Sequence, residues 1–102
     1  MKDALALLNQ LEVVLKREAL WSERKPSATA MASQVPFSAD VMAFEQWLQF
    51  IYLPRLREML RVQSALPFTM EVAPAAEVYL PERLTVIRIL RQLDSVAAGQ
   101  LR

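Results

Sequence analysis

The chain has 102 residues, of which 54% are hydrophobic and 23% are charged, so it is long and apolar enough for a packed core and is not a disordered chain. Its 12 basic and 11 acidic side chains give a formal net charge of +1, which excludes a general attraction to nucleic acid or to an anionic membrane. We expect a single helical domain over residues 1–102.

The residue types that are missing exclude several chemistries. The sequence contains no cysteine, no histidine and only one glycine. Disulfides, thiolate nucleophiles, zinc sites with sulfur or imidazole ligands, histidine acid–base catalysis and glycine-rich phosphate loops are therefore excluded. No two carboxylates have the spacing of a metal site or of paired acid–base work. We therefore expect no enzymatic activity, no cofactor and no bound metal.

The first predicted helix runs from Asp3 to about Trp21, because apolar residues recur there at steps of three and four. Its expected core residues are Leu8, Leu11 and Leu15. Acidic residues interrupt the apolar run, so it is not a signal peptide, and no stretch approaches the roughly 20 apolar residues that span a bilayer. We expect a cytoplasmic protein without membrane contact.

After this helix, Pro26 predicts the start of a short helix over residues 27–33. Phe37 is an expected core residue that fills the core or packs on the start of the next helix. Ser38 or Asp40 is expected to cap that helix.

The central helix is predicted over residues 40–61, where large apolar side chains again recur at helical spacing. Pro54 lies inside it and cannot donate a hydrogen bond to the carbonyl of Phe50, so a kink or a restart is expected there. The expected core residues of this helix are Phe44, Trp47, Leu48, Ile51, Leu56 and Leu60.

The C-terminal part predicts two more helical segments. Residues 75–80 are long enough for one or two turns, and Pro81 with Glu82 indicates the start of a last helix. Gly99 stands where a C-terminal cap belongs. The expected core residues of the last helix are Ile87 and Leu90. The predicted fold class is all-α, a compact four- to five-helix bundle with a Pro-kinked central helix.

Three segments carry a family resemblance: PSATAMASQVPF (Pro26–Phe37), FEQWLQFIYLPRL (Phe44–Leu56) and VAPAAEVYL (Val72–Leu80). Together and in this order they resemble the YqcC-like family of small bacterial proteins. The matching motif positions are Phe37, Gln46, Trp47, Leu48, Gln49, Pro54 and Arg55. The resemblance implies a small all-helical bundle whose biochemical function is not established, and it carries over no catalytic residue. It also implies a link to tRNA modification, because members are often encoded beside a tRNA pseudouridine synthase and are sometimes named after it.

Gln46, Gln49 and Arg55 are the sharpest candidates for a binding site. The two amides are three residues apart and share a helical face, and Arg55 follows Pro54. Their donors and acceptors suit a carboxylate, a peptide backbone or a base edge. The alternative, which we favour, is that the glutamines hold loops to the bundle and satisfy the carbonyl left free by the proline.

Aromatic residues are the second candidate. Trp47 with Phe44, Phe50 and Tyr52 is either a base-stacking platform or, as is far more usual for such aromatics, part of the core. Phe50 and Tyr52 lie off the main apolar face of the predicted helix, so they either pack on flanking segments or form an exposed contact patch, which is the expected partner surface.

Arginines are the third candidate. Arg55, Arg57 and Arg61 could form a phosphate-binding strip together with Arg88 and Arg91 of the last helix. Nearby acidic residues favour a solvated face with surface ion pairs instead.

These features predict a helical interaction or accessory protein that acts through an unidentified protein partner or as a homodimer, with tRNA pseudouridylation as the pathway implied by the resemblance. Two alternatives stay open. An RNA-binding accessory module, which is less favoured, would show affinity that falls steeply with salt. A small-molecule-binding domain would have a pocket lined by Trp47 and Gln49. An exposed Gln46–Gln49–Arg55 face keeps all three hypotheses open, whereas buried and paired side chains favour protein contacts.

Overall fold

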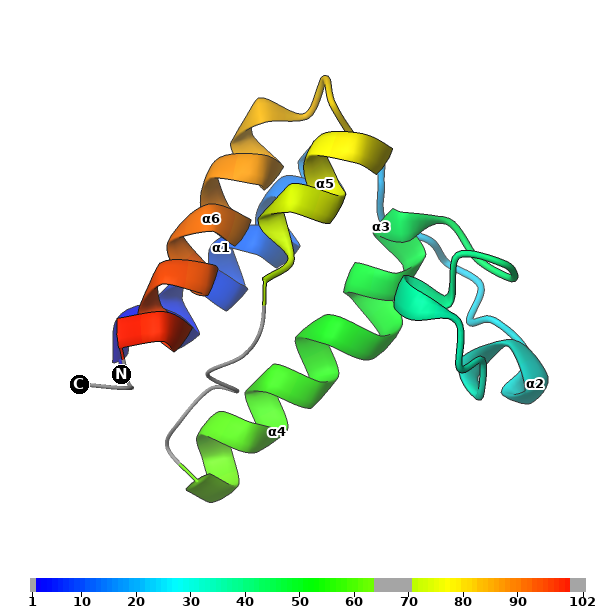
Figure 1. Ribbon diagram of the computed structural model, residues 1–102, viewed down its shortest axis with the longest axis horizontal. Helices are drawn as coiled ribbons and strands as arrows, with labels where there is room; N and C mark the ends of the chain where they lie inside the picture. Colours follow the sequence, from blue (N-terminus) through cyan, green and yellow to red (C-terminus); the bar gives the residue numbers. More distant parts are fainter. Residues whose placement is uncertain (1, 64–70, 100–102) are drawn as a thin grey trace.

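The computed structural model describes residues 2–63 and 71–99 of the chain. In these residues the protein is helical and forms no strand, so the predicted all-α fold class is confirmed (Figure 1). The elements, in chain order, are α1 (Lys2–Arg17), α2 (Ala28–Met31), the 3-10 turn η1 (Pro36–Ser38), α3 (Phe44–Trp47), the π-helical turn η2 (Leu48–Tyr52), α4 (Leu53–Gln63), α5 (Ala73–Tyr79) and α6 (Leu84–Gly99).

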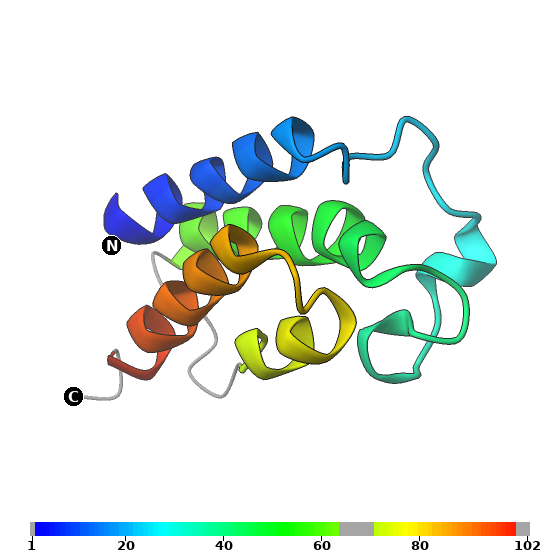
Figure 2. The same cartoon turned by 90° about the horizontal axis from the view of Figure 1, so that it is seen from above.

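The longer helices pack around one hydrophobic core. α1 and α6 lie side by side and run in opposite directions, so the start of α1 and the end of α6 are at the same end of the molecule (Figures 1 and 2). α4 packs against α1, and α5 packs against α6. The expected core residues that are buried between these helices are Leu8, Leu11, Leu15, Phe44, Leu48, Leu56, Ile87 and Leu90.

The other expected core residues lie at the edge of the core. Phe37, Trp47 and Leu60 are half-buried and pack against it, and Ile51 is half-buried as well. Part of the surface of Trp47 and Ile51 therefore remains open to solvent, which matters for the candidate site below.

α1 ends at Arg17, earlier than the predicted end near Trp21. The backbone of Ala19 is left-handed, with a φ of 59°, and the N–H of Leu20 donates to the carbonyl of Leu15 (2.8 Å). Such a bond around a left-handed residue ends a helix and satisfies one of its last carbonyls. Alanine is unfavourable in this conformation, and the packing of Leu20 against the core offsets the cost.

A turn delays the start of the central helix. Phe37 and Ser38 have φ values of 57° and 52°, so the chain changes direction there, and the helix begins at Phe44 instead of Asp40. The N-cap position is occupied by Ala43. The prediction that Ser38 or Asp40 caps this helix is therefore wrong, because both lie within the turns that come before the N-cap residue Ala43.

The irregularity predicted at Pro54 takes the form of a wider helical turn. The N–H of Leu53 donates to the carbonyl of Leu48, five residues earlier, which closes a π-helical turn directly before the proline. Helical structure is continuous from Phe44 to Gln63. The π-helical turn thus accommodates a residue that has no N–H to donate, and the helix does not break.

The remaining boundaries differ by a few residues from the prediction. α2 is a single turn capped by Ser27, whose hydroxyl accepts a hydrogen bond from the N–H of Ala30 (3.1 Å). α6 begins at Leu84, and Pro81 lies in the turn before it. Gly99 is the last residue of α6 and does not have the left-handed backbone of a C-cap glycine. It is therefore an ordinary helical residue.

Candidate functional site

Gln46 caps the central helix. It stands three residues after the N-cap residue Ala43, and its Oε1 accepts a hydrogen bond from the N–H of Ala43 (3.0 Å). This is one half of a capping box, and it satisfies a backbone donor at the start of the helix. Its side-chain oxygen is therefore already occupied by the backbone of its own helix.

Gln49 is buried and holds a distant segment. Its Oε1 accepts a hydrogen bond from the N–H of Ser22, and its Nε2 donates to the carbonyl oxygen of the same residue, each at 2.7 Å. The side-chain amide thus pairs with both backbone groups of Ser22, as a neighbouring strand does in a β-bridge. Gln49 lies on the inner side of the helix, so the hypothesis of a small-molecule pocket lined by Trp47 and Gln49 is not supported by the position of the glutamine.

Arg55 is exposed and is separated from both glutamines. Trp47, Ile51 and Arg55 each border two neighbouring hollows, so they form a ridge between these hollows along the central helix. A hollow of about 450 Å³ lies on one side of this ridge, toward Val35, and a hollow of about 280 Å³ lies on the other side, toward Glu71. The structure thus places Arg55 between two shallow hollows with half-buried apolar walls, and the predicted trio does not form one binding face.

The aromatic residues near the start of the central helix form a packed cluster. Phe44 stacks on Trp47, with 5.8 Å between ring centroids, and on Tyr79 of α5, with 5.4 Å. Phe37 meets the rings of Phe44 and Trp47 edge-on, at 5.7 and 4.9 Å. These geometries are favourable for aromatic pairs. The faces of Phe44 are therefore used within the protein, to hold η1 and α5 against the central helix.

The expected exposed patch of Phe50 and Tyr52 is wrong for Tyr52. Tyr52 is 1% exposed and is the largest fully buried side chain among the described residues. A π-helical turn contains more residues than an α-helical turn, so the positions in η2 rotate away from the face that α-helical spacing predicts. Phe50 is half-buried and borders the hollow toward Val35.

Asp94 of α6 is a structural residue that the sequence analysis did not single out. Its Oδ2 accepts hydrogen bonds from the N–H groups of Val72 and Ala73, at 2.9 and 2.8 Å, and so caps the start of α5. Burial raises the pKa of the Asp94 carboxyl, and the two backbone hydrogen bonds oppose this rise. Its donors are more than twenty residues away in the chain, so no local sequence signal marks it.

The environment of Tyr52 includes this carboxylate. Burial raises the pKa of the Tyr52 phenol, and the negative charge of Asp94 raises it further. Within the part of the chain that the structure describes, neither the Tyr52 hydroxyl nor Oδ1 of Asp94 has a hydrogen-bond partner, although both are buried. A buried polar group without a hydrogen-bond partner lowers stability.

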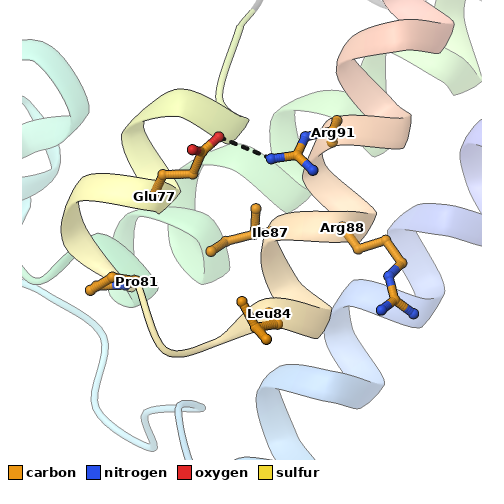
Figure 3. A pocket seen from close by; sticks show the side chains of 6 residues that line it. All are labelled: Glu77, Pro81, Leu84, Ile87, Arg88 and Arg91. Atoms are coloured by element: carbon orange, nitrogen blue, oxygen red, sulfur yellow. Dashed lines mark hydrogen bonds and ion pairs between the residues drawn. The ribbon is translucent and has the colours of Figure 1, made fainter.

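The five candidate arginines lie on α4 and α6, and three of them are paired with carboxylates. The ion pairs are Arg57–Glu12 (2.7 Å), Arg61–Glu58, and Arg91–Glu77 (3.0 Å; Figure 3). Lys16 and Arg57 together hold the pKa of the Glu12 carboxyl below its ordinary value. Exposed pairs of this kind contribute little to stability, because solvent screens the charges. They also neutralise much of the charge that a phosphate-binding strip on α4 would need.

Among residues 2–63 and 71–99, no three cysteine, histidine, aspartate or glutamate side chains lie close enough together to hold a metal ion. No helix in this part of the chain is both long and apolar enough to cross a lipid bilayer.

Comparison with known proteins identifies the family. Residues 3–96 match the family model described as "DUF446: tRNA pseudouridine synthase C". The chain is 32% identical over 95 residues to "Uncharacterized protein YqcC" of Escherichia coli, and the match covers 89% of this chain and 87% of the relative. The chain belongs to the YqcC-like family.

Two other relatives extend this result. An "Uncharacterized protein" of Haemophilus influenzae is 36% identical to this YqcC-like chain over 86 residues, which are 84% of this chain and 77% of the relative. The "tRNA pseudouridine synthase C" of Pectobacterium carotovorum is 38% identical over 60 residues, which are 59% of this chain but only 16% of that protein. No solved structure matches the chain significantly.

Proposed function

We propose that this YqcC-like protein is a helical accessory protein that binds a tRNA pseudouridine synthase and supports the pseudouridylation of tRNA. The observation that carries the proposal is the match to the Pectobacterium protein named tRNA pseudouridine synthase C. The matched segment is 16% of that protein, so most of that polypeptide lies outside the similarity. We infer that a segment related to this chain and a synthase share one polypeptide there.

A separate accessory chain is not covalently joined to the synthase, so it needs a binding interface to stay beside that enzyme. Joining two modules in one polypeptide raises their effective concentration, often to the millimolar range, and a separate protein reaches the same occupancy only by specific binding. The described surface offers apolar side chains for such contacts: Val13, Val78 and Leu84 are 59%, 72% and 67% exposed. These residues support binding through protein contacts, in which the accessory protein itself performs no chemical step.

RNA binding is the alternative, and the ion pairs weigh against it. Arg57 and Arg61, two of the three arginines of the proposed strip on α4, face Glu12 and Glu58. A protein that binds RNA through its phosphates needs several cations free of such partners. Of these three arginines, Arg55 provides one positive charge between two hollows, which suits a side-chain carboxylate of a protein partner better than a phosphate backbone.

The test combines binding with a measurement of the modification. The purified protein is titrated into a purified tRNA pseudouridine synthase C of the same bacterium, with both samples treated with RNase, and the heat of binding is recorded. Deletion of the gene is followed by mass-spectrometric quantification of pseudouridine in bulk tRNA. We expect a saturable complex that survives RNase, and less pseudouridine in the deletion strain. No complex together with an unchanged pseudouridine content would contradict the proposal.

A further inference from the structure

α1 and α6 border an open groove on the outside of the molecule, with a volume of about 500 Å³. Val14 and Ile89, each 5% exposed, form its apolar floor, and Val13 stands at its edge with 59% exposure. The groove is distinct from the ridge of Trp47, Ile51 and Arg55, which lies on the central helix. It therefore offers a second and independent surface.

The groove has polar and cationic walls. Gln10 and Arg17 of α1 face Thr85, Arg88 and Gln92 of α6 across it. The amides and the hydroxyl can both donate and accept hydrogen bonds, and the two guanidinium groups only donate. No carboxylate is among the described residues that line the groove. Its surface is thus apolar at the centre and positive at the edges.

Two carboxylates near these arginines are paired with other cations. Glu18, which follows Arg17 in sequence, lies 3.5 Å from Arg83. Glu77 is paired with Arg91, and Figure 3 shows that Arg88 instead extends from α6 toward α1, away from Glu77. Within the described residues, Arg17 and Arg88 take part in no ion pair. Their charges are available to a partner.

We propose that the α1–α6 groove binds an acidic amphipathic helix of the synthase; this inference rests on the proposed function. Amphipathic helices bind in hydrophobic grooves through apolar residues spaced three and four apart. Here such residues would contact Val13, Val14 and Ile89, and flanking carboxylates would pair with Arg17 and Arg88. From Gln10 to Arg17 the groove follows α1 for about 10 Å, which is the length of about two turns of the bound helix.

The groove fits a protein helix better than RNA. Of the residues that the structure describes, two cations line it, whereas phosphate-dominated binding uses a run of cations along the backbone. Exposed Val13 and the apolar floor between the arginines would gain nothing from contact with phosphates. Aliphatic and guanidinium groups side by side are instead the composition of a protein–protein interface.

Three variants test the groove. Val13→Asp places a carboxylate at its apolar edge, and the double variant Arg17→Glu/Arg88→Glu reverses its charge. Arg24→Glu is the matched control, because Arg24 is exposed, lies outside the groove and makes the described hydrogen bonds only through its backbone. All substituted side chains are exposed, so we expect unchanged circular dichroism and melting temperature, and these are measured first.

Each variant is titrated with three probes: the purified synthase, a synthetic Leu/Glu-rich amphipathic helical peptide, and total tRNA. We expect the Kd for the synthase and for the peptide to rise about five- to tenfold for Val13→Asp and for the double variant Arg17→Glu/Arg88→Glu, with no change for Arg24→Glu. Amide chemical shifts of the peptide complex, recorded by NMR, should change along α1 and α6.

The outcomes separate the groove from the proposed function. If the synthase binds and the groove variants leave its Kd unchanged, the groove assignment fails and the proposed function stands. If the peptide binds in the groove and the synthase does not bind at all, the helix-binding groove stands and the synthase is not its partner. If tRNA binds and the charge reversal abolishes that binding, the groove does not bind a protein helix. If neither the synthase nor the peptide binds, the proposal also fails.

Discussion

Tyr52 has a well-packed ring, but its hydroxyl has no hydrogen-bond partner among the described residues. Its ring is buried between the central helix and its neighbours and lies 5.5 Å from the ring of Trp47. Its hydroxyl is buried without a hydrogen-bond partner among the described residues, and the carboxylate of Asp94 acts on it. Burial of an unpaired hydroxyl costs about 1–3 kcal/mol, so the apolar part of the ring must outweigh this cost.

Tyr52→Phe should therefore leave the fold intact and stabilise the protein by up to about 1 kcal/mol, because it removes the hydroxyl and keeps the ring. The free energy of unfolding in urea is the measurement. Tyr52→Ala is the control and should cost about 3–5 kcal/mol, as the truncation of a buried aromatic side chain does. A clear loss of stability in Tyr52→Phe would mean that the hydroxyl has a partner.

At the scale of an element, α5 depends on α6 for its start. α5 has seven residues, from Ala73 to Tyr79, and its N-cap residue Val72 has no side chain that can accept a hydrogen bond. Helices of this length are unstable alone. Asp94 supplies the missing acceptor from α6, so the cap is also a tertiary contact that joins the two helices.

Asp94→Asn tests both the cap and the charge. The amide oxygen can still accept the two hydrogen bonds, so the stability at neutral pH should stay close to that of the natural protein or exceed it. Asp94→Ala removes the acceptor and should cost about 1–2 kcal/mol. Unfolding free energies of the three proteins at pH 7 decide between these outcomes, and a large loss in Asp94→Asn would show that the negative charge itself is needed.

The contribution of Asp94 to the free energy of unfolding depends on pH, because its pKa is raised in the folded protein. The native protein keeps a proton on this carboxyl at pH values at which the unfolded chain, with the ordinary pKa of 3.8, has released it. The contribution of Asp94 to stability is therefore complete below pH 3.8 and falls as the pH rises through the folded-state pKa. The stability difference between the natural protein and Asp94→Asn should shift in favour of Asp94→Asn between about pH 3 and 7. A difference that is constant over this range would contradict the assignment.

At the scale of the whole molecule, Gln49 connects parts of the chain that are far apart in sequence. It binds both backbone groups of Ser22, a residue 27 positions earlier, in the segment that leads from α1 to the central helix. Because this segment has little regular structure of its own, one buried side chain determines where it crosses the helix. The segment in turn positions Phe37 against the aromatic cluster.

Gln49→Ala should lower the free energy of unfolding by about 2 kcal/mol, since it removes two hydrogen bonds and leaves two backbone groups of Ser22 without their partner. Amide hydrogen exchange at Ser22 should become faster in this variant. Gln92→Ala is the matched control, because Gln92 is exposed on α6, and its stability should change by less than about 0.5 kcal/mol. Equal effects of the two substitutions would mean that the link to Ser22 is not important.

The helices and most of the core follow from the sequence alone, whereas the hydrogen-bond partners of the polar residues do not. Residues such as Leu8, Leu48 and Leu90 repeat at helical spacing, and this period is a local property that can be read within a few turns. The amides of Gln46 and Gln49 look equivalent in the sequence, yet one caps its own helix and the other binds Ser22.

The tertiary structure decided which of the candidate residues remain available for binding. Arg57 and Arg61 form ion pairs with carboxylates, and Tyr52, in the π-helical turn before Pro54, is buried in the core. Arg17 and Arg88 lie 71 positions apart in the chain, and only the packing of α1 against α6 brings them to one groove. Helical period depends on neighbours three and four residues away, but hydrogen-bond partners, ion pairs and grooves depend on where distant segments meet. That is why the fold could be predicted from the sequence and the candidate binding surface could not.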